Sequence, residues 1–234
     1  MTTAVDEEVV DLAVTPLREL NQRLHDVALQ GEGPRRWRIV NPKGAHAVAC
    51  GLDAELEVEI DGHVGYYCAG MNKLATVVVR GNASTGIAEN MMSGRVIVDG
   101  SVSQSAGATA HGGLLAVHGD AAARCGISMK GVDIVVKGSV GPMSAFMAQA
   151  GALVVFGDAG ANLGDSIYEA RLFVRGAVES LGADCVEKPM QADDRAALEN
   201  ALAKAGVAVP LDGFRFYGSA RRLYHFHADH VGEY

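Results

Sequence analysis

The chain has 234 residues, of which 49% are hydrophobic, and its formal net charge is −8. This acidic balance argues against nucleic acid or an anionic membrane as a partner. No apolar stretch approaches the ~20 residues of a membrane-spanning helix, and the acidic start differs from a signal peptide, so we expect a cytoplasmic protein.

Residues 1–37 are predicted to form an N-terminal arm with one amphipathic helix. Thr15 is a suitable N-cap, and Pro16 fits the first helical position because it has no N–H to leave unpaired. Apolar residues then follow at helical spacing, at Leu17, Leu20, Leu24 and Val27.

A nineteen-residue repeat dominates residues 38–190. Runs such as Val77-Val78-Val79 predict short buried strands, each ended by a turn glycine. One strand per repeat, with no helix between strands, favours an all-β fold: a single-stranded, right-handed parallel β-helix of about seven coils with flanking N- and C-terminal α-helices. The turn glycines are Gly62, Gly81, Gly100, Gly119, Gly138, Gly157 and Gly176.

A second column of the repeat contains only small residues. It lies seven positions after each glycine, and we interpret it as a corner with no room for a side chain. Its members are Ala69, Ala88, Gly107, Gly126, Ala145 and Gly164.

The middle residue of each strand must face outward if its two neighbours fill the interior. This outward column is also apolar, and a strip of that length needs a cover. Two covers remain open, a terminal helix of the same chain or a partner subunit. The candidate interface residues are Val78, Ile97, Val135, Val154 and Phe173, with Ala116 in the same column.

Residues 191–234 are predicted to form a C-terminal helix and a tail. The helix should run from Asp193 to Ala205, with Gly206 ending it, and a short strand should follow at residues 214–217. The tail carries three histidines beside aromatic residues, which is more typical of a docking segment than of a metal site. These histidines are His225, His227 and His230.

No catalytic, cofactor-binding or metal-binding residue is predicted on this chain. Cys68 and Cys125 occupy one column three coils apart, about 14 Å, whereas a disulfide needs Cα atoms within about 7 Å. No Cys-x-x-Cys pair suggests a zinc or iron–sulfur site. The loop at 157–165 looks like a phosphate-binding loop, but Gly157 and Gly164 belong to the repeat and no helix follows them.

Glycine spacings in the coils carry a family resemblance. Gly81-x4-Gly86-x7-Gly94, Gly107-x5-Gly113 and Gly126-x4-Gly131 resemble the GXGXG β-helix domain at the C-terminus of the glutamate synthase large subunit. The stretches at 15–21, 86–94 and 222–226 look like the stand-alone β-helix small subunit of N-methylglutamate synthase and of related glutamate-synthase-like complexes.

This resemblance implies a non-catalytic scaffold in a hetero-oligomer. It would join an amidotransferase-like subunit to an FMN-dependent, iron–sulfur-containing synthase subunit, and the complex would convert glutamate and methylamine to N-methylglutamate and ammonia. Other glutamate-synthase-like amidotransferases, and the similar β-helix scaffold of formylmethanofuran dehydrogenase and formyltransferase/hydrolase complexes, are alternatives. A self-sufficient β-helix enzyme acting on polysaccharide is the alternative from a different class.

Overall fold

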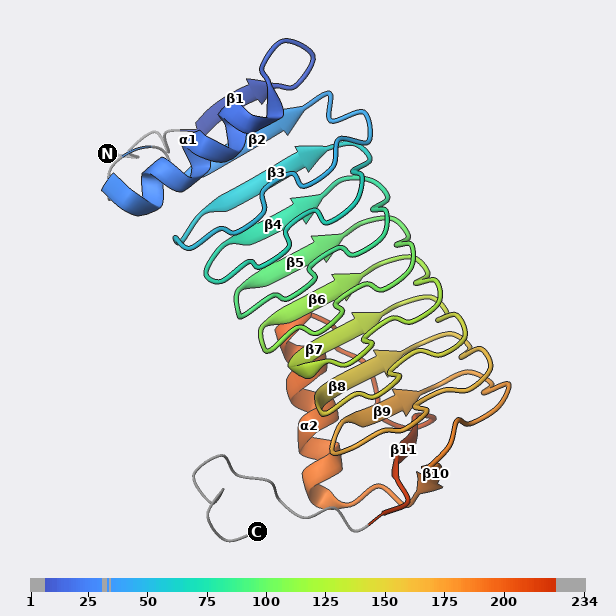
Figure 1. Ribbon diagram of the computed structural model, residues 1–234. Helices are drawn as coiled ribbons and strands as arrows, with labels where there is room; N and C mark the ends of the chain where they lie inside the picture. Colours follow the sequence, from blue (N-terminus) through green and yellow to red (C-terminus); the bar gives the residue numbers. More distant parts are fainter. Residues whose placement is uncertain (1–6, 31–32, 34, 222–234) are drawn as a thin grey trace, which may run out of the picture.

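The computed structural model describes residues 7–30, 33 and 35–221, which form a rod of stacked coils (Figure 1). Within these residues one eleven-stranded sheet runs in the order β1-β2-β3-β4-β5-β6-β7-β8-β9-β11-β10. Strands β1 to β9 are parallel, and one α-helix lies near each end of the chain. The predicted parallel β-helix with flanking helices is therefore confirmed.

The elements follow the repeat closely. In chain order they are β1 (Glu7–Asp11), α1 (Leu17–Gln30), β2 (Arg36–Val40), β3 (Glu57–Asp61), β4 (Thr76–Val79), β5 (Arg95–Val98), β6 (Leu114–Val117), β7 (Lys130–Val136), β8 (Ala150–Val155), β9 (Arg171–Val174), β10 (Cys185–Lys188), α2 (Ala192–Lys204) and β11 (Arg215–Ser219).

Strand register places residues nineteen apart side by side. Val77 pairs with Val96, and Leu115 pairs with Ile134, one coil further on in each case. The first and third apolar residues of each strand point inward and are fully buried, as Val77 and Val79 are. Because side chains alternate along a strand, the middle residue faces out.

The period glycines are required by contact between coils. Only Gly62 has a left-handed φ, at +137°. A Cβ on Gly138 would lie 2.8 Å from the carbonyl oxygen of Gly119 in the preceding coil. The N–H of Gly138 donates to that same oxygen at 3.0 Å. These positions were expected to be glycine for turn conformation, which applies to Gly62, whereas from Gly81 to Gly176 the backbones approach too closely for any side chain.

The small-residue column is restricted by backbone conformation as well as by packing. All six members have φ between +52° and +68°, in the left-handed region that glycine adopts most readily. All six are buried. A Cβ on Gly107 would lie 2.7 Å from Cδ1 of Ile134, so this corner offers little space.

The ends of the rod are closed by elements from outside the repeat. Leu20, Leu24 and Val27 of α1 join the main core, and Asn21 bonds to the backbone of the first coil at Ala47 and Ala49. At the other end β11 enters antiparallel between β9 and β10. The sheet thus crosses both boundaries expected at 37/38 and 190/191.

Candidate functional site

Over strands β6 to β9 the outward apolar strip is covered by the chain itself. Val135, Val154 and Phe173 are at most 1% exposed. They pack in one cluster with α2 and with the aromatic residues that follow it, at Leu198, Ala201, Leu202, Phe214 and Phe216. Three of the five candidate interface residues are therefore unavailable to a partner, while Val78 and Ile97 remain half-buried.

Polar contacts fix α2 at both of its ends. Near the N-terminus, Asp194 accepts from Arg171 at 3.1 Å. At the C-terminus, Arg95 donates to the carbonyl oxygen of Lys204 at 2.6 Å, which satisfies an acceptor that a helix end leaves unpaired. Lys204 also reaches Asp133 at 2.5 Å. These contacts give the helix one defined position on the sheet.

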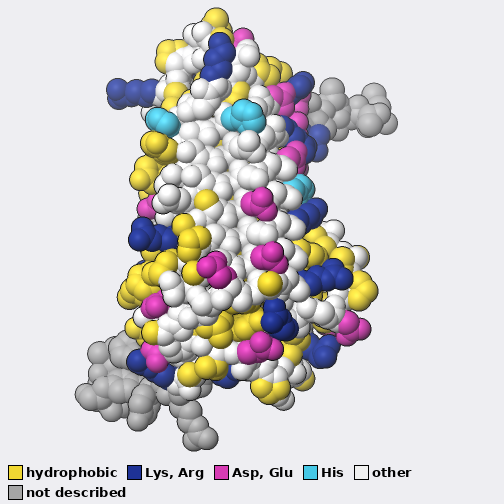
Figure 2. Space-filling view, turned by 90° about the vertical axis from the view of Figure 1, so that its right-hand side faces the viewer, with side chains coloured by type: hydrophobic (Ala, Val, Ile, Leu, Met, Phe, Trp, Pro, Cys, Tyr) yellow, Lys and Arg dark blue, Asp and Glu magenta, His cyan; other side chains and the backbone are white. Residues whose placement is uncertain are grey.

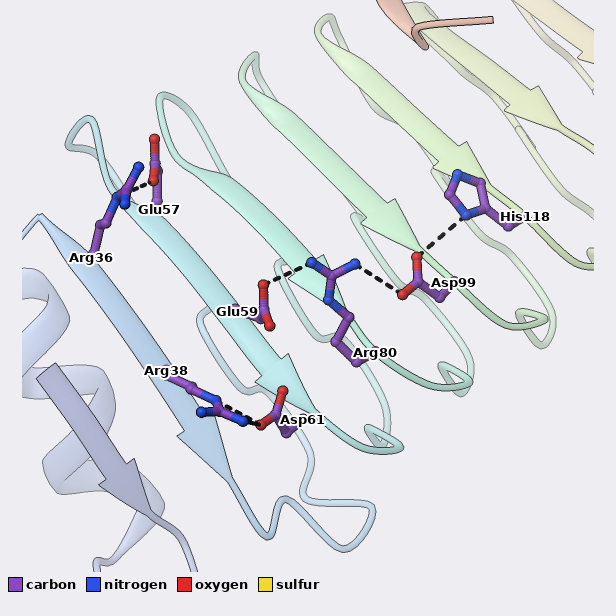
Figure 3. Close-up of polar contacts among 8 residues, drawn as sticks. All are labelled: Arg36, Arg38, Glu57, Glu59, Asp61, Arg80, Asp99 and His118. Carbon is purple, nitrogen blue, oxygen red and sulfur yellow. Dashed lines mark hydrogen bonds and ion pairs between the residues drawn. The ribbon is translucent and has the colours of Figure 1, made fainter. Parts of the chain in front are cut away.

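Over strands β2 to β5 the same sheet face is charged and uncovered (Figure 3). Neighbouring strands place opposite charges side by side, and Arg80 bridges Glu59 at 2.8 Å and Asp99 at 3.1 Å. These two carboxylates, Glu59 foremost, raise the pKa of the Arg80 side chain through hydrogen bonds. The other pairs are Arg36–Glu57, Arg38–Asp61 and His118–Asp99.

A shallow hollow of about 290 Å³ opens on this charged half of the sheet, beside Arg36, Glu57 and Val78. Of its charged side chains, Arg36 pairs with Glu57, and Glu59 pairs with Arg80 just outside the hollow, while Glu7 adds a further carboxylate. We therefore interpret this half as a solvated face, whose exposed ion pairs each contribute little to stability.

A ladder of polar side chains runs along the rod, one residue after the period glycines. In each step a backbone N–H donates to the side chain of the preceding coil, at 2.7–3.1 Å. The acceptors are His63, Asn82, Ser101, Asp120, Ser139 and Asp158, and the last donor is Ala177. The repeat needs a polar residue here because the turn leaves that N–H without a backbone partner.

Asp120→Ala is expected to lower the free energy of unfolding by about 1 kcal/mol, because the Ser139 N–H loses its acceptor. Asp120→Asn keeps a side-chain oxygen and should stay close to the unchanged chain. Urea unfolding followed by circular dichroism measures both. Equal losses in the two variants would assign the effect to the charge of Asp120 instead.

The four cysteines do not form a reactive or metal-binding group. All four are free thiols, and Cys68, Cys125 and Cys185 are buried. Burial raises the pKa of Cys125 to about 12 and that of Cys185 to about 11, and it also raises the pKa of Cys68. Since the thiolate is the nucleophile, these buried thiols are poorly reactive in the folded chain.

Alkylation of the folded chain with iodoacetamide near neutral pH is expected to leave the three buried thiols unmodified. Cys50 is half-buried, and its raised pKa should make its reaction slow. In urea all four should react. Mass spectrometry of the intact chain gives the count, and rapid labelling of Cys125 in the folded chain would contradict its burial.

The remaining candidate groups are dispersed or lie outside the described residues. In the part of the chain that the structure describes, no three His, Cys, Asp or Glu side chains gather in a way that could hold a metal ion. Nor does any helix of that part have the length and apolar character to cross a bilayer. His63 and Asp158 serve the ladder, and His118 pairs with Asp99. His225, His227 and His230 lie outside the described residues.

The sequence is similar to that of a known protein. No family model and no solved structure matches the sequence. Protein GlxC of Rhizobium meliloti (strain 1021) is 57% identical over 227 residues, which covers 97% of this chain and 99% of the relative. The chain belongs to the GlxC family. Because the similarity to GlxC spans almost the whole chain, it includes α1 and α2 as well as the coils.

Proposed function

We propose that this chain is the β-helix scaffold subunit of a glutamate-synthase-like complex, with N-methylglutamate synthase as the specific activity. The observation that carries the proposal is the nineteen-residue register from β3 to β9, with one irregularity between Lys130 and Asp133, whose glycine spacings resemble the glutamate synthase β-helix domain. Membership of the GlxC family over nearly the full length is consistent with a dedicated subunit.

The chain's own residues support a structural role in such a complex. The inward-facing residues form the core, and the glycines and small residues allow the coils to stack closely. The polar side chains of the ladder accept hydrogen bonds from backbone N–H groups of the turns. Within the described residues we find no nucleophile, base and orienting group held together as covalent catalysis requires. The rod therefore contributes a rigid surface of fixed length.

The chemistry would come from two partner chains. We expect an amidotransferase-like subunit and an FMN-dependent synthase subunit that also carries an iron–sulfur cluster, in a cytoplasmic hetero-oligomer. The complex would join the methylamine nitrogen to the glutamate skeleton and release ammonia, giving N-methylglutamate. On this chain we expect no cofactor.

Co-expression tests the proposal directly. The tagged chain is produced with an amidotransferase-like chain and a flavin-dependent synthase-like chain of the same organism, and the purified material is sized by light scattering and scanned for flavin absorbance. A three-chain complex that forms N-methylglutamate from glutamate and methylamine is the expected result.

Other outcomes would change the proposal in defined ways. A flavin-containing complex that uses ammonia but not methylamine would support the scaffold role and would contradict methylamine as the substrate. A colourless rod that binds neither chain would contradict the scaffold role. Hydrolase or lyase activity of the rod alone on a polysaccharide would support the alternative of a different class.

A further inference from the structure

The exposed hydrophobic side chains of the rod are unevenly distributed. We define the return face by the nine-residue segments 66–74, 85–93, 104–112, 123–131, 142–150 and 161–169, which occupy equivalent positions in six successive coils. Figure 3 looks onto the outer sheet face, and the turns that return the chain lie behind the strands. Of the eleven large hydrophobic residues exposed in the described part of the chain, seven lie on the return face.

Five of these seven lie in the first two segments of the face, and each is 46–57% exposed. We call them the apolar strip: Tyr66, Tyr67, Met71, Leu74 and Met92. The two tyrosine rings contact each other edge to face, with centroids 6.3 Å apart, and Tyr66 also stacks on His46 at 4.5 Å. The tyrosines are therefore held in place before any partner binds, which lowers the entropy cost of binding.

The Tyr67 ring lies over a glycine of the next coil. A Cβ on Gly86 would come within 2.6 Å of Cδ1 of Tyr67. The glycine thus makes room for an aromatic ring that stays half exposed. Exposed large hydrophobic groups of this kind, when they gather in one place, mark an interaction surface.

The return face carries fewer charged residues than the outer sheet face. Its fifty-four residues include six charged ones, about half the density of the whole chain, which is 21% charged. Depletion of charge together with Tyr and Met is the composition of an interface core. On the outer sheet face, by contrast, charges are dense and already paired. Figure 2 shows hydrophobic side chains along its left-hand edge and alternating charges along its upper right-hand edge.

The size of this surface and the charge of the chain indicate which kind of molecule binds there. Six coils at about 4.8 Å each make a face about 29 Å tall, close to the side of a square patch of ~800 Å², the area that each partner buries in a standard complex. A net charge of −8 opposes the approach of a second copy, of nucleic acid or of an anionic membrane. A different protein with a charge-poor apolar surface fits best.

We infer that the return face, centred on the apolar strip, is the surface through which this chain binds one of its partner subunits. This inference rests on the proposed function, because it assigns a surface to a complex that the proposed function requires. The outer sheet face is then left to α2 and to solvent.

Binding of the full-length chain to each purified partner chain, measured by isothermal titration calorimetry, tests the inference. Leu74→Arg and Met92→Arg each place a charge in the apolar strip and should weaken binding to one partner at least about tenfold. Leu74→Met keeps the apolar character and should bind as the unchanged chain does. Val14→Arg and Leu29→Arg add the same charge at residues that are 80% and 81% exposed elsewhere, and should bind normally.

The outcomes separate the inference from the proposed function. If the unchanged chain binds neither partner, the proposed function fails. If it binds and both strip variants bind equally well, the return face is not the interface and the inference is wrong. A dimer of the unchanged chain that Leu74→Arg dissociates would also overturn it, in favour of self-association. Melting curves of each variant confirm that weaker binding is not loss of folding.

Discussion

Replacing Gly138 with alanine is expected to lower the free energy of unfolding by about 3 kcal/mol, at the upper end of the usual cost of overpacking. The new Cβ would lie 2.8 Å from the oxygen and 2.9 Å from the carbonyl carbon of Gly119, and backbone atoms cannot rotate away. The two central coils must then separate. For a chain of this length we expect the melting temperature to fall by about 6–12 °C.

Gly206→Ala is the matched control for this effect. Gly206 follows α2 with φ at +67°, and a Cβ there would meet no atom within 4 Å. The substitution should cost only about 1 kcal/mol, the penalty of a left-handed conformation for alanine. Calorimetric melting of both variants under one condition makes the comparison. If Gly138→Ala lost no more stability than Gly206→Ala, close contact between coils would not explain the glycine column.

Leu198→Asp is expected to release α2 from the sheet. Leu198 is completely buried against the outward strip, and Leu→Ala at such sites alone costs about 2–5 kcal/mol. A buried carboxylate without a partner adds to that cost. Since the rod has its own core, we expect the coils to remain folded while the helix detaches.

Hydrogen exchange should show this as faster exchange of amides in α2 and normal protection in β3 to β5. The outward column on strands β6 to β9, uncovered when α2 detaches, should also bind a hydrophobic dye and promote self-association. Asn200→Asp, an exposed substitution in the same helix, is the control and should change neither readout. Uniform loss of protection along the rod would instead mean that α2 and the coils unfold as one unit.

The repeat made most of the rod predictable. A period of nineteen fixes strand register, and the alternation at Val77, Val78 and Val79 assigns each side chain to the interior or the outside. The elements outside the repeat were harder to predict from the sequence. Strand β1 is short and acidic, so it resembles an arm, and its place in the sheet depends on pairing with β2. The antiparallel insertion of β11 has no local signal, because it depends on the free edge of β9.

The surfaces were only partly predictable, for a similar reason. The outward strip could be recognised as apolar, but its cover depends on where α2 docks, and that position is set by contacts such as Arg95 with Lys204, more than a hundred residues apart. The polar ladder did have a signal, since every coil from His63 to Asp158 has a polar residue after the glycine. Its role emerged only from the folded chain, because donor and acceptor lie in different coils.

Because of the polar ladder and the stacked glycines, each nineteen-residue coil is an equivalent unit of the rod. Each coil offers its predecessor a donor and its successor an acceptor of the same kind, so one coil can be removed whole without leaving an unmatched group. Deleting nineteen residues between β3 and β5, away from α2, would shorten the span between the two ends by about 4.8 Å. Losing a single residue would instead shift every side chain in that coil. The length of the rod can therefore change only in whole steps, by duplication or loss of a coil.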